Sequence, residues 1–494
     1  MALEHDTHQY RYHDLEDEAN RIASLLRAQG VERNDRVALL LDNGFDYVAG
    51  FFGILKAGAC CVALNSSNKT RTTALLLQDS GAVGLITQGL MVKTDLPEIT
   101  QATKNLSFVL VDRAAPSWVL PDRIHVLLRQ DVEAASTEHH PLPVSSDDLC
   151  AILYTSGSTG KPRGVTLSHG NLMANTEQIL AYLELGADDS VLSVLPFHYS
   201  YGNSLLLTHV AVGGRVVVDN RFAYPATIVD ALEERRVTSF AGVPSTYAIL
   251  TNRTDFLQRS WPDLRYLTQA GGAMTPALQR RLRETLPARI HLFIMYGQTE
   301  AGARLSWLPP ELLPTKYGSI GRGIPGVDLT VRREDGSICG VGEVGEVVAS
   351  GPNIMQGYWN DPAETALVLK NGRLHTGDLG RQDEDGDIWL VDRMKNMIKA
   401  GANRVSAKEI EETIAEVPGV QEVCVVGIPD EMLGEAIEAF VVPQPGGDFD
   451  PNTIRQHCRR HLALFKIPRA IHQLDTMPRS SAGKVLKQEL LNLR

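Results

Sequence analysis

Residues 154 to 164 read Tyr154-Thr-Ser-Gly-Ser-Thr-Gly-Lys-Pro-Arg-Gly164, and this stretch decides the fold. It comes directly after the apolar segment Cys150–Leu153, which predicts a buried strand. Glycines let a backbone approach an anion closely, and consecutive amides and hydroxyls can surround a phosphate. Lys161 and Arg163 add positive charge at the end of the stretch. The sequence therefore predicts a phosphate-binding loop that follows a buried strand.

This loop is not a Walker loop, which requires the pattern G-x-x-x-x-G-K-[ST]. Aligning Gly160 and Lys161 with the G-K of that pattern puts Thr155 where the first glycine belongs, and Pro162 where the last hydroxyl belongs. The alternative is a flexible Ser/Gly linker. A linker would not normally follow a buried strand directly or carry two cations, so we expect a phosphate loop of another kind.

The composition is that of a globular protein with more than one domain. At 494 residues the chain exceeds the roughly 250–300 residues at which single cores stop growing. Hydrophobic residues make up 43% and charged residues 22%, which is ordinary for a globular protein. The net charge of −11 disfavours a nucleic-acid-binding role but allows a small anionic ligand to bind.

Location is predicted from what the sequence lacks. No segment approaches the roughly 18 unbroken apolar residues of a spanning helix, so we expect no membrane insertion. The first residues, Met1–Asp6, show neither the basic nor the apolar part of a secretory signal. The six cysteines form no C-x-x-C pair, as is typical of a reducing compartment. We therefore expect a cytoplasmic protein.

Strands alternate with helices through most of the chain, which is typical of an α/β protein with mostly parallel sheets. Many glycines and short alternating segments between about Ile320 and Leu390 predict antiparallel structure instead. A new unit begins after Arg393, so we predict an N-terminal domain of residues 1–394 and a C-terminal domain of residues 395–494. The expected strands include residues 36–41, 61–64, 190–195, 214–218, 237–242, 423–426 and 438–442, and the expected helices include residues 46–56, 407–416 and 451–461.

The phosphate loop closely resembles that of the adenylate-forming superfamily, which includes acyl-CoA synthetases, aryl-CoA ligases, peptide-synthetase adenylation domains and firefly luciferase. The resemblance runs from Tyr12 to Lys484, with the motifs in the family's order. It implies a large N-terminal region of two α/β subdomains plus a β-barrel-like subdomain, and a small mobile α+β C-terminal domain. It also assigns the loop residues to ATP binding: Thr155, Ser156, Gly157, Ser158, Thr159, Gly160 and Lys161.

The segment Tyr296-Gly-Gln-Thr-Glu300 follows an apolar strand and matches the family motif Y-G-x-T-E. The match implies that Tyr296 and Gly297 line the nucleotide site and that Thr299 donates to the α-phosphate. Glu300 would hold Mg²⁺, a cation that prefers oxygen ligands. The alternative is a helix N-cap followed by an acid, and both interpretations can hold together.

Two further segments resemble the nucleotide-binding parts of the family. Gly271, Gly272 and Ala273 lie in a segment similar to the loop that packs on the adenine. Asp378 ends a His-Thr-Gly-Asp segment, where a carboxylate can accept from both ribose hydroxyls. Arg393 resembles the arginine that reaches the ribose and phosphate, and its alternative is a surface salt bridge of little energy.

The resemblance places the catalytic lysine and the hinge in the C-terminal part. Lys484, in Pro478-Arg-Ser-Ser-Ala-Gly-Lys484, would bridge the carboxylate and the phosphate, where a cation stabilises the charge that develops. Lys395 occupies the hinge position about which the C-terminal domain would rotate between half-reactions. Ala402 stands where the family usually has a glycine beside the pantetheine, a departure that bears on transfer to free CoA and not on adenylation.

The acid itself is only partly predicted. His198, in Leu195-Pro-Phe-His-Tyr-Ser200, resembles a gate beside the carboxylate site, and a satisfied core histidine is its alternative. Amino-acid-activating members place an aspartate near this point, and this segment has none. Nearby tyrosines and an amide favour an aryl, short-chain or hydroxylated acid.

The leading functional hypothesis is an ATP- and Mg²⁺-dependent ligase that converts a small carboxylic acid to an acyl-AMP and transfers the acyl group to CoA. A ligase that loads the phosphopantetheine of an acyl carrier protein is the close alternative. A non-catalytic nucleotide-binding protein would be expected to lack Lys484, Glu300 or Asp378, and all three are present. No feature of the sequence requires luciferase-like oxygen chemistry.

Overall fold

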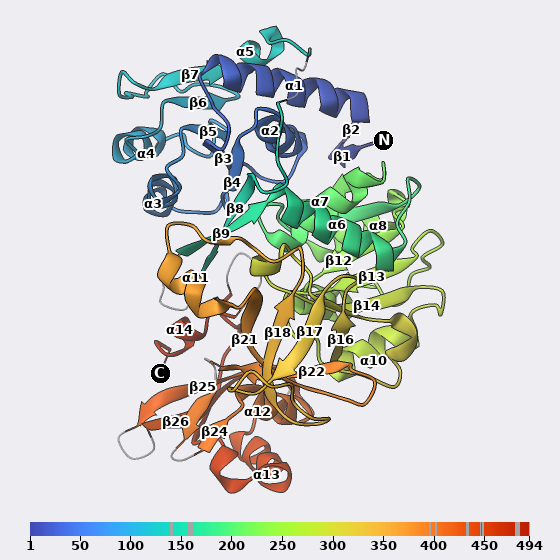
Figure 1. Cartoon of the computed structure of the whole chain (residues 1–494). Coiled ribbons are helices and arrows are strands. Elements are labelled where there is room, and N and C mark those ends of the chain that lie inside the picture. Colours follow the sequence, from blue (N-terminus) through green and yellow to red (C-terminus); the bar gives the residue numbers. More distant parts are fainter. Residues whose placement is uncertain are drawn as a thin grey trace.

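The computed structural model describes residues 1–138, 142–156, 162–394, 397–400, 403–430, 434–444, 446, 449–479 and 485–493. These residues form three sheets that follow one another along the molecule (Figure 1). The N-terminal strands and helices lie at the top of the view, and the C-terminal sheet lies at the bottom. The predicted class, a mixed α/β fold with a large N-terminal region and a smaller C-terminal domain, is confirmed.

The first sheet has the strand order β19-β9-β8-β4-β3-β5-β6-β7. Strands β3 to β8 pair in parallel, and Val37, Ala38 and Leu39 of β3 are fully buried. Parallel strands covered on both faces are continuous apolar runs, as the sequence shows here. The bounds are β3 Arg36–Leu40, β4 Cys60–Ala63, β5 Gly84–Thr87, β6 Phe108–Val111, β7 His125–Leu128, β8 Leu149–Ser156, β9 Pro162–Ser168, β19 Gly357–Tyr358, α1 Tyr12–Ala28, α2 Phe45–Lys56, α3 Thr70–Ser80, α4 Leu96–Ala102 and α5 Arg129–Ala134.

The second sheet contains a parallel part in the order β14-β13-β12-β10-β11-β1, with the short β2 at its edge. Its helices begin with α6, whose N-cap Ser168 accepts a hydrogen bond from the backbone of Asn171. The bounds are β1 Leu3–His5, β2 His8–Tyr10, β10 Ser190–Ser193, β11 Arg215–Val218, β12 Ser239–Gly242, β13 Tyr266–Gln269, β14 His291–Tyr296, α6 His169–Leu183, α7 Ser200–Ala211, α8 Pro225–Glu234, α9 Pro244–Arg253 and α10 Pro276–Thr285.

The antiparallel strands predicted between Ile320 and Leu390 are present, and they continue the second sheet beyond β14 instead of forming a sheet of their own. The short β15 makes this possible, because it pairs antiparallel with β14 on one side and with β16 on the other. The bounds are β15 Ser306–Leu308, β16 Ser319–Gly323, β17 Asp328–Arg332, β18 Gly345–Ser350, β20 Leu369–Lys370, β21 Arg373–Gln382, β22 Ile388–Arg393, α11 Pro362–Val368 and the single 3₁₀ turns η1 Thr299–Ala301 and η2 Pro310–Leu312.

The third sheet belongs to the C-terminal part, in the order β24-β23-β26-β25 with β27 beside β26. The helix predicted at residues 451–461 is α13, with Asp450 as its N-cap. The predicted domain boundary after residue 394 stays a prediction. The bounds are β23 Ile398–Ala400, β24 Asn403–Val405, β25 Val420–Asp430, β26 Gly434–Pro443, β27 Ala470–Gln473, α12 Ala407–Ala415, α13 Pro451–His461, α14 Lys487–Leu490 and the 3₁₀ turn η4 Leu464–Lys466.

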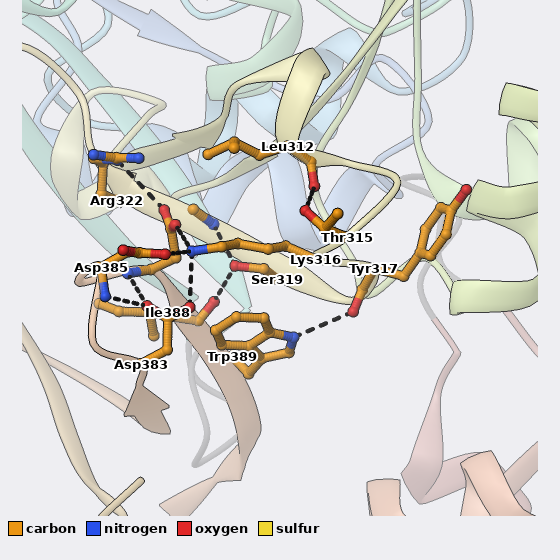
Figure 2. Close-up of polar contacts among 12 residues, drawn as sticks. Leu312, Thr315, Lys316, Tyr317, Ser319, Arg322, Asp383, Asp385, Ile388 and Trp389 are labelled. Carbon is orange, nitrogen blue, oxygen red and sulfur yellow. Dashed lines mark hydrogen bonds and ion pairs between the residues drawn. The ribbon is translucent and has the colours of Figure 1, made fainter. Parts of the chain in front are cut away.

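A half-buried lysine, Lys316, joins the segment after η2 to the β21–β22 hairpin (Figure 2). The Nζ atom of Lys316 lies 2.8 Å from a carboxylate oxygen of Asp383 and 2.7 Å from one of Asp385, and it also contacts Asp387, which is fully buried. Burial alone would lower the pKa of Lys316, but the three carboxylates raise it. These carboxylates could form a cation site, and the lysine ammonium already lies among them. The cluster therefore ties the segment after η2 to the hairpin, and removal of one partner would leave a buried charge unpaired.

None of the helices in the described part of the chain has the length and apolarity needed to cross a bilayer.

Replacing Lys316 by Met should destabilise the protein strongly. The change leaves the carboxylate of Asp387 buried, with Arg322 at 3.4 Å as its remaining cationic partner among the described residues. Removing one partner of a buried ion pair typically costs about 3 kcal/mol or more in the free energy of unfolding. Urea denaturation followed by tryptophan fluorescence measures the loss.

The matched control is Arg333→Met, which removes a surface ion pair with Glu343 in the same region of the sheet. Because both of its partners are well exposed, the control should lose far less stability than Lys316→Met. Equal losses for the two variants would show that the Lys316 cluster adds nothing beyond an ordinary surface pair.

Candidate active site

The predicted site residues lie where neighbouring parallel strands end. Strands β12, β13 and β14 are adjacent and parallel, so their carboxyl ends share one edge of the second sheet. The segment after β13 contains Gly271–Ala273, and the segment after β14 contains Gly297–Glu300. Ligands of open α/β sheets bind outside the carboxyl ends of the strands. This edge is therefore the candidate active site.

The predicted phosphate loop connects two paired strands of the first sheet. Strands β8 and β9 run antiparallel, with Thr155 opposite Arg163 and Ser156 opposite Pro162. The loop residues between them, Gly157–Lys161, lie outside the described residues. The guanidinium of Arg163 lies 2.6 Å from the carboxylate of Glu364 and over the ring of Tyr358. Arg163 is thus a structural contact in this structure.

Tyr358 links the phosphate hairpin to Glu300. Its strand, β19, pairs with β9, and its hydroxyl donates to Oε1 of Glu300 at 2.8 Å. Burial, followed by the charge of Glu300, raises the pKa of Tyr358, so the hydroxyl keeps its proton. The contact fixes the carboxylate through one oxygen and leaves the other to bind a cation. One or two carboxylates together with phosphate oxygens are a common set of Mg²⁺ ligands, so Glu300 fits the predicted role.

Thr299 and His198 both lie near the start of α7. The hydroxyl of Thr299, which is buried, lies 3.3 Å from that of Ser200 in the first turn of α7. The turn that carries His198 is held from the first sheet by the buried side chain of Asn43. That amide donates to the carbonyl of Leu195 at 2.8 Å and accepts from the amide of Phe197 at 2.7 Å.

Burial lowers the pKa of His198 to about 4, although the charge of Asp42 opposes this. The imidazole is therefore neutral at physiological pH. A neutral histidine can face a substrate carboxylate through one N–H but does not supply a full positive charge. This favours a gating or orienting role for His198 over charge stabilisation.

The predicted adenine loop follows β13 directly. Gln269 shapes it, because its side-chain amide donates to the carbonyl of Gly272 at 2.7 Å. Gly271 has a φ of +82°, a backbone conformation that residues other than glycine rarely adopt. Gly271, Gly272 and Ala273 are exposed, so a flat base can lie against their backbone. Packing requires a glycine at position 297, since a Cβ there would lie 2.1 Å from the carbonyl oxygen of Ala303.

Asp378 is a buried carboxylate with two partners. Its Oδ2 accepts from the hydroxyl of Tyr296 at 2.6 Å, and its Oδ1 lies 2.9 Å from Nε of Arg393. Asp378 and Arg393 are also directly opposite each other in the β21–β22 ladder. The charge of Asp378 raises the pKa of Arg393, and burial raises that of Tyr296 well above its usual value. A carboxylate has about four acceptor positions, so two remain for the ribose hydroxyls.

Several predicted residues cannot be placed. Ser156 is described only as the last residue of β8, and Gly157, Ser158, Thr159, Gly160, Lys161, Lys395, Ala402 and Lys484 lie outside the described residues. The described residues that the structure brings together are Tyr296, Thr299, Glu300, Asp378 and Arg393. Sequence reasoning missed Tyr358, Ser200 and Asn43, which hold Glu300, Thr299 and the His198 turn. None of the three is a motif residue, and only its pairing across the fold reveals its role.

A family model described as AMP-binding enzyme matches residues 1–359, and one described as AMP-binding enzyme C-terminal domain matches residues 409–484. The chain belongs to the AMP-binding enzyme family. It is 34% identical to a feruloyl-CoA synthase of Amycolatopsis sp over 99% of this chain and 95% of that protein. It is 32% identical to the indoleacetate–CoA ligase of Aromatoleum aromaticum over 98% of this chain and 92% of that protein.

Solved structures agree with these relatives. The o-succinylbenzoate CoA synthetase of Bacillus subtilis, solved in complex with its acyl-adenylate intermediate, superposes with a TM-score of 0.85 at 26% identity and covers 99% of this chain and 94% of its own. The same synthetase has been solved with ATP and a magnesium ion. The predicted superfamily and the predicted class, an AMP-forming acid–thiol ligase, are therefore confirmed.

Replacing Asp378 by Asn should weaken ATP use without unfolding the protein. The change keeps the shape of the side chain but removes the charge that pairs with Arg393 and the acceptors for the ribose. Hydrogen bonds to a charged group contribute about 1.5–3 kcal/mol each, so kcat/KM for ATP should fall by about 10- to 100-fold. The ATP dependence of pyrophosphate exchange measures this.

Asp328→Asn is the matched control, because Asp328 forms an ion pair with Arg373 at the exposed end of β17. Its kcat/KM for ATP should stay at the wild-type value. An unchanged value for Asp378→Asn as well would remove Asp378 from the nucleotide site.

The low pKa of His198 predicts how stability depends on pH. The unfolded chain takes up a proton near pH 6.5, whereas the folded protein does so only near pH 4. Below pH 6.5 the unfolded state therefore binds more protons at this position, and stability falls as the pH falls toward 4. His198→Asn should make this decline shallower, as measured by urea midpoints at pH 7.5, 6.0 and 5.0. Parallel declines for the two proteins would contradict the buried, neutral histidine.

Proposed function

We propose that the protein is an AMP-forming acid–CoA ligase that uses ATP and Mg²⁺ to activate a small aromatic acid. The observation that carries the proposal is the Tyr296–Asp378–Arg393 arrangement, in which the carboxylate is buried and the guanidinium is accessible. It lies at the strand edge where Thr299 and Glu300 also lie. Asp378 supplies hydrogen-bond acceptors for a ribose. Beside it, the hydroxyl of Thr299 can donate to a phosphate, and the carboxylate of Glu300 can bind the cation that accompanies the phosphate. The names of the two aromatic-acid ligases among the relatives support the substrate class.

The reaction consists of two displacements. First, an oxygen of the acid's carboxylate attacks the α-phosphorus of ATP, and pyrophosphate leaves. Thr299 donates to the α-phosphate, Asp378 holds the ribose, and Glu300 would ligate Mg²⁺, which neutralises phosphate charge when bound. Lys484 would stabilise the negative charge that develops between the carboxylate and the phosphate. In the second displacement the sulfur of CoA attacks the acyl carbonyl, AMP leaves, and the thioester forms.

The hinge at Lys395 and the domains 1–394 and 395–494 are part of this proposal. The contacts across the proposed boundary support it. Ser406, at the start of α12, donates to the carboxylate of Asp392 at 2.9 Å, and the ammonium of Lys408 contacts the carbonyl of Leu390. Rotation about Lys395 would have to break these contacts, so they favour the orientation that the structure shows. The proposed location is the cytoplasm, in agreement with six cysteines that are all buried and free.

A carrier protein's phosphopantetheine is the second candidate acceptor. It ends in the same thiol as CoA, so the chemistry of both displacements is unchanged. Ala402, in place of the usual glycine beside the pantetheine, is the observation that favours it. Supplying CoA and a phosphopantetheinylated carrier protein to the same enzyme decides between the two acceptors.

Pyrophosphate exchange tests the proposal directly. With ATP, Mg²⁺ and a panel of aromatic acids but no thiol, exchange should depend on the acid. Lys484→Ala should lower the rate by about 10²- to 10³-fold, as loss of a charge-stabilising group does. The matched control is Lys370→Ala, an exposed lysine of β20, which should keep the wild-type rate. Acid-independent exchange, or no exchange by a protein that binds ATP in calorimetry, would overturn the proposed function.

A further inference from the structure

The backbone that carries Asp378 leaves the regular ladder between β18 and β21. The two strands pair antiparallel on both sides of this point, but the register shifts between Glu346 and Val348 of β18. A single residue of β18, Val347, therefore stands opposite residues 376–378 of β21. Extra residues in one strand form a β-bulge, which often lies beside an active site and changes the direction of a side chain. Residues 376–378 are called the Asp378 bulge below.

Side chains hold this bulge where regular pairing with β18 is interrupted. The amide of Gly377 donates to Oε1 of Glu346 at 3.1 Å. The amide of Asp378 donates to the hydroxyl of Thr376 at 3.1 Å, and that hydroxyl donates to the carbonyl of Val347 at 2.7 Å. Buried or half-buried amides need acceptors, and here side-chain oxygens supply them in place of the ladder.

Glu346 binds the residue before the bulge as well as the bulge itself. Its Oε2 lies 2.7 Å from Nδ1 of His375, and both side chains are half-buried. A carboxylate only accepts, so Nδ1 of His375 carries the hydrogen. The two oxygens of one side chain therefore fix His375 and Gly377 together against β18.

Gly377 depends on this contact because little else restrains it. Its φ of +71° lies in the left-handed region, which glycine shares freely with other conformations. A Cβ at this position would contact none of the described atoms beyond its chain neighbours, so packing does not hold the residue in place. The hydrogen bond to Glu346 thus selects one conformation of a residue that could adopt several.

The conformation of Gly377 decides where the carboxylate of Asp378 points. That carboxylate accepts from Tyr296 and pairs with Arg393, and its remaining acceptor positions are the ones assigned to the ribose. Hydrogen bonds weaken steeply when donor and acceptor are misaligned. A small displacement of the bulge would therefore weaken the hydrogen bonds between Asp378 and the ribose hydroxyls.

We propose that Glu346 is a positioning residue for ribose recognition. It holds the Asp378 bulge so that the unused acceptor positions of Asp378 meet the ribose hydroxyls of ATP. In this role Glu346 acts through Gly377 and His375 and needs no contact with the nucleotide. The inference rests on the proposed function, in which Asp378 binds the ribose.

The experiment compares nucleotides that differ by one ribose hydroxyl. Acid-dependent pyrophosphate release in the presence of CoA is measured with ATP, 2′-deoxy-ATP and 3′-deoxy-ATP, using the aromatic acid that supports the fastest exchange. For the wild-type protein, kcat/KM should be about 10- to 100-fold higher for ATP than for either deoxynucleotide, because each lacks a hydrogen bond to a charged group.

Three variants separate position from charge. Glu346→Ala removes both contacts, and Glu346→Asp keeps the charge but shortens the side chain by one methylene. Both should reduce the ATP/deoxy-ATP ratio of kcat/KM to less than about threefold. Glu346→Gln keeps the length, an acceptor for Gly377 and an amide that can donate to Nδ1 of the other His375 tautomer. Its ratio should stay within about threefold of the wild-type value.

Glu343→Ala is the matched control. Glu343 lies between β17 and β18, and its carboxylate pairs with Arg333 and accepts from the backbone amide of Gly340 at 2.9 Å. It thus makes the same kinds of contact as Glu346, but at an exposed turn. The control should keep the wild-type ratio.

The outcomes separate this inference from the proposed function. Unchanged ratios in folded Glu346→Ala and Glu346→Asp, with lower rates for all nucleotides, would show a merely structural role and overturn the inference. A ratio kept by Glu346→Asp and lost by Glu346→Gln would overturn it as well, since charge would then matter and position would not. Urea midpoints establish that each variant is folded, and if Glu346→Ala does not fold, the other two variants decide.

The wild-type protein gives two further results. Equal kcat/KM for ATP and both deoxynucleotides overturns the ribose-positioning role and leaves the ligase function standing. No pyrophosphate release with any acid, from protein that binds ATP, overturns the proposed function itself.

Discussion

The buried carboxylate of Asp378 is the interaction on which the rest of the site depends. A buried charge must be paired and hydrogen-bonded, since desolvation otherwise costs several kcal/mol. Asp378 obtains its partners from two different parts of the sheet, Tyr296 at the end of parallel strand β14 and Arg393 at the end of antiparallel strand β22. The requirement to pair this charge therefore fixes the antiparallel strands against the parallel ones at the place where the nucleotide would lie.

The same region leads directly to the C-terminal part. Asp392 precedes Arg393, and its carboxylate accepts from the hydroxyl of Ser406 and from the backbone of Lys408 at the start of α12. The end of β22 thus carries two neighbouring charged residues that contact different parts of the protein. Arg393 pairs with Asp378, while Asp392 accepts hydrogen bonds at the N-terminus of α12, whose N-cap is Ser406. A movement of α12 that displaces Asp392 would also displace Arg393 of the ribose-binding pair, because the two residues are adjacent in the chain.

Much of this could be predicted from the sequence because it depends on local patterns. Apolar runs separated by helical segments predicted the parallel strands, and β3, α2 and α13 lie within about a residue of their predicted bounds. The phosphate hairpin, the Tyr296–Glu300 segment and Asp378 lie in short sequence motifs that can be recognised without a structure. The paired partners could not be predicted. Tyr358 is 58 residues from Glu300 and Asn43 is 154 residues from Phe197, and no local pattern records such contacts.

Arg393 shows where local reasoning is ambiguous. From sequence alone it was either a ligand-binding arginine or a surface salt bridge, and the structure gives it features of both: an ion pair with Asp378 and a side chain that is 47% exposed. The two interpretations are compatible. Asp378 of the ion pair is buried, but the guanidinium of Arg393 remains accessible and can bind a ligand as well. The antiparallel continuation of the second sheet was unpredictable for a related reason, since the three residues of β15 that join the two parts are too few to show a period.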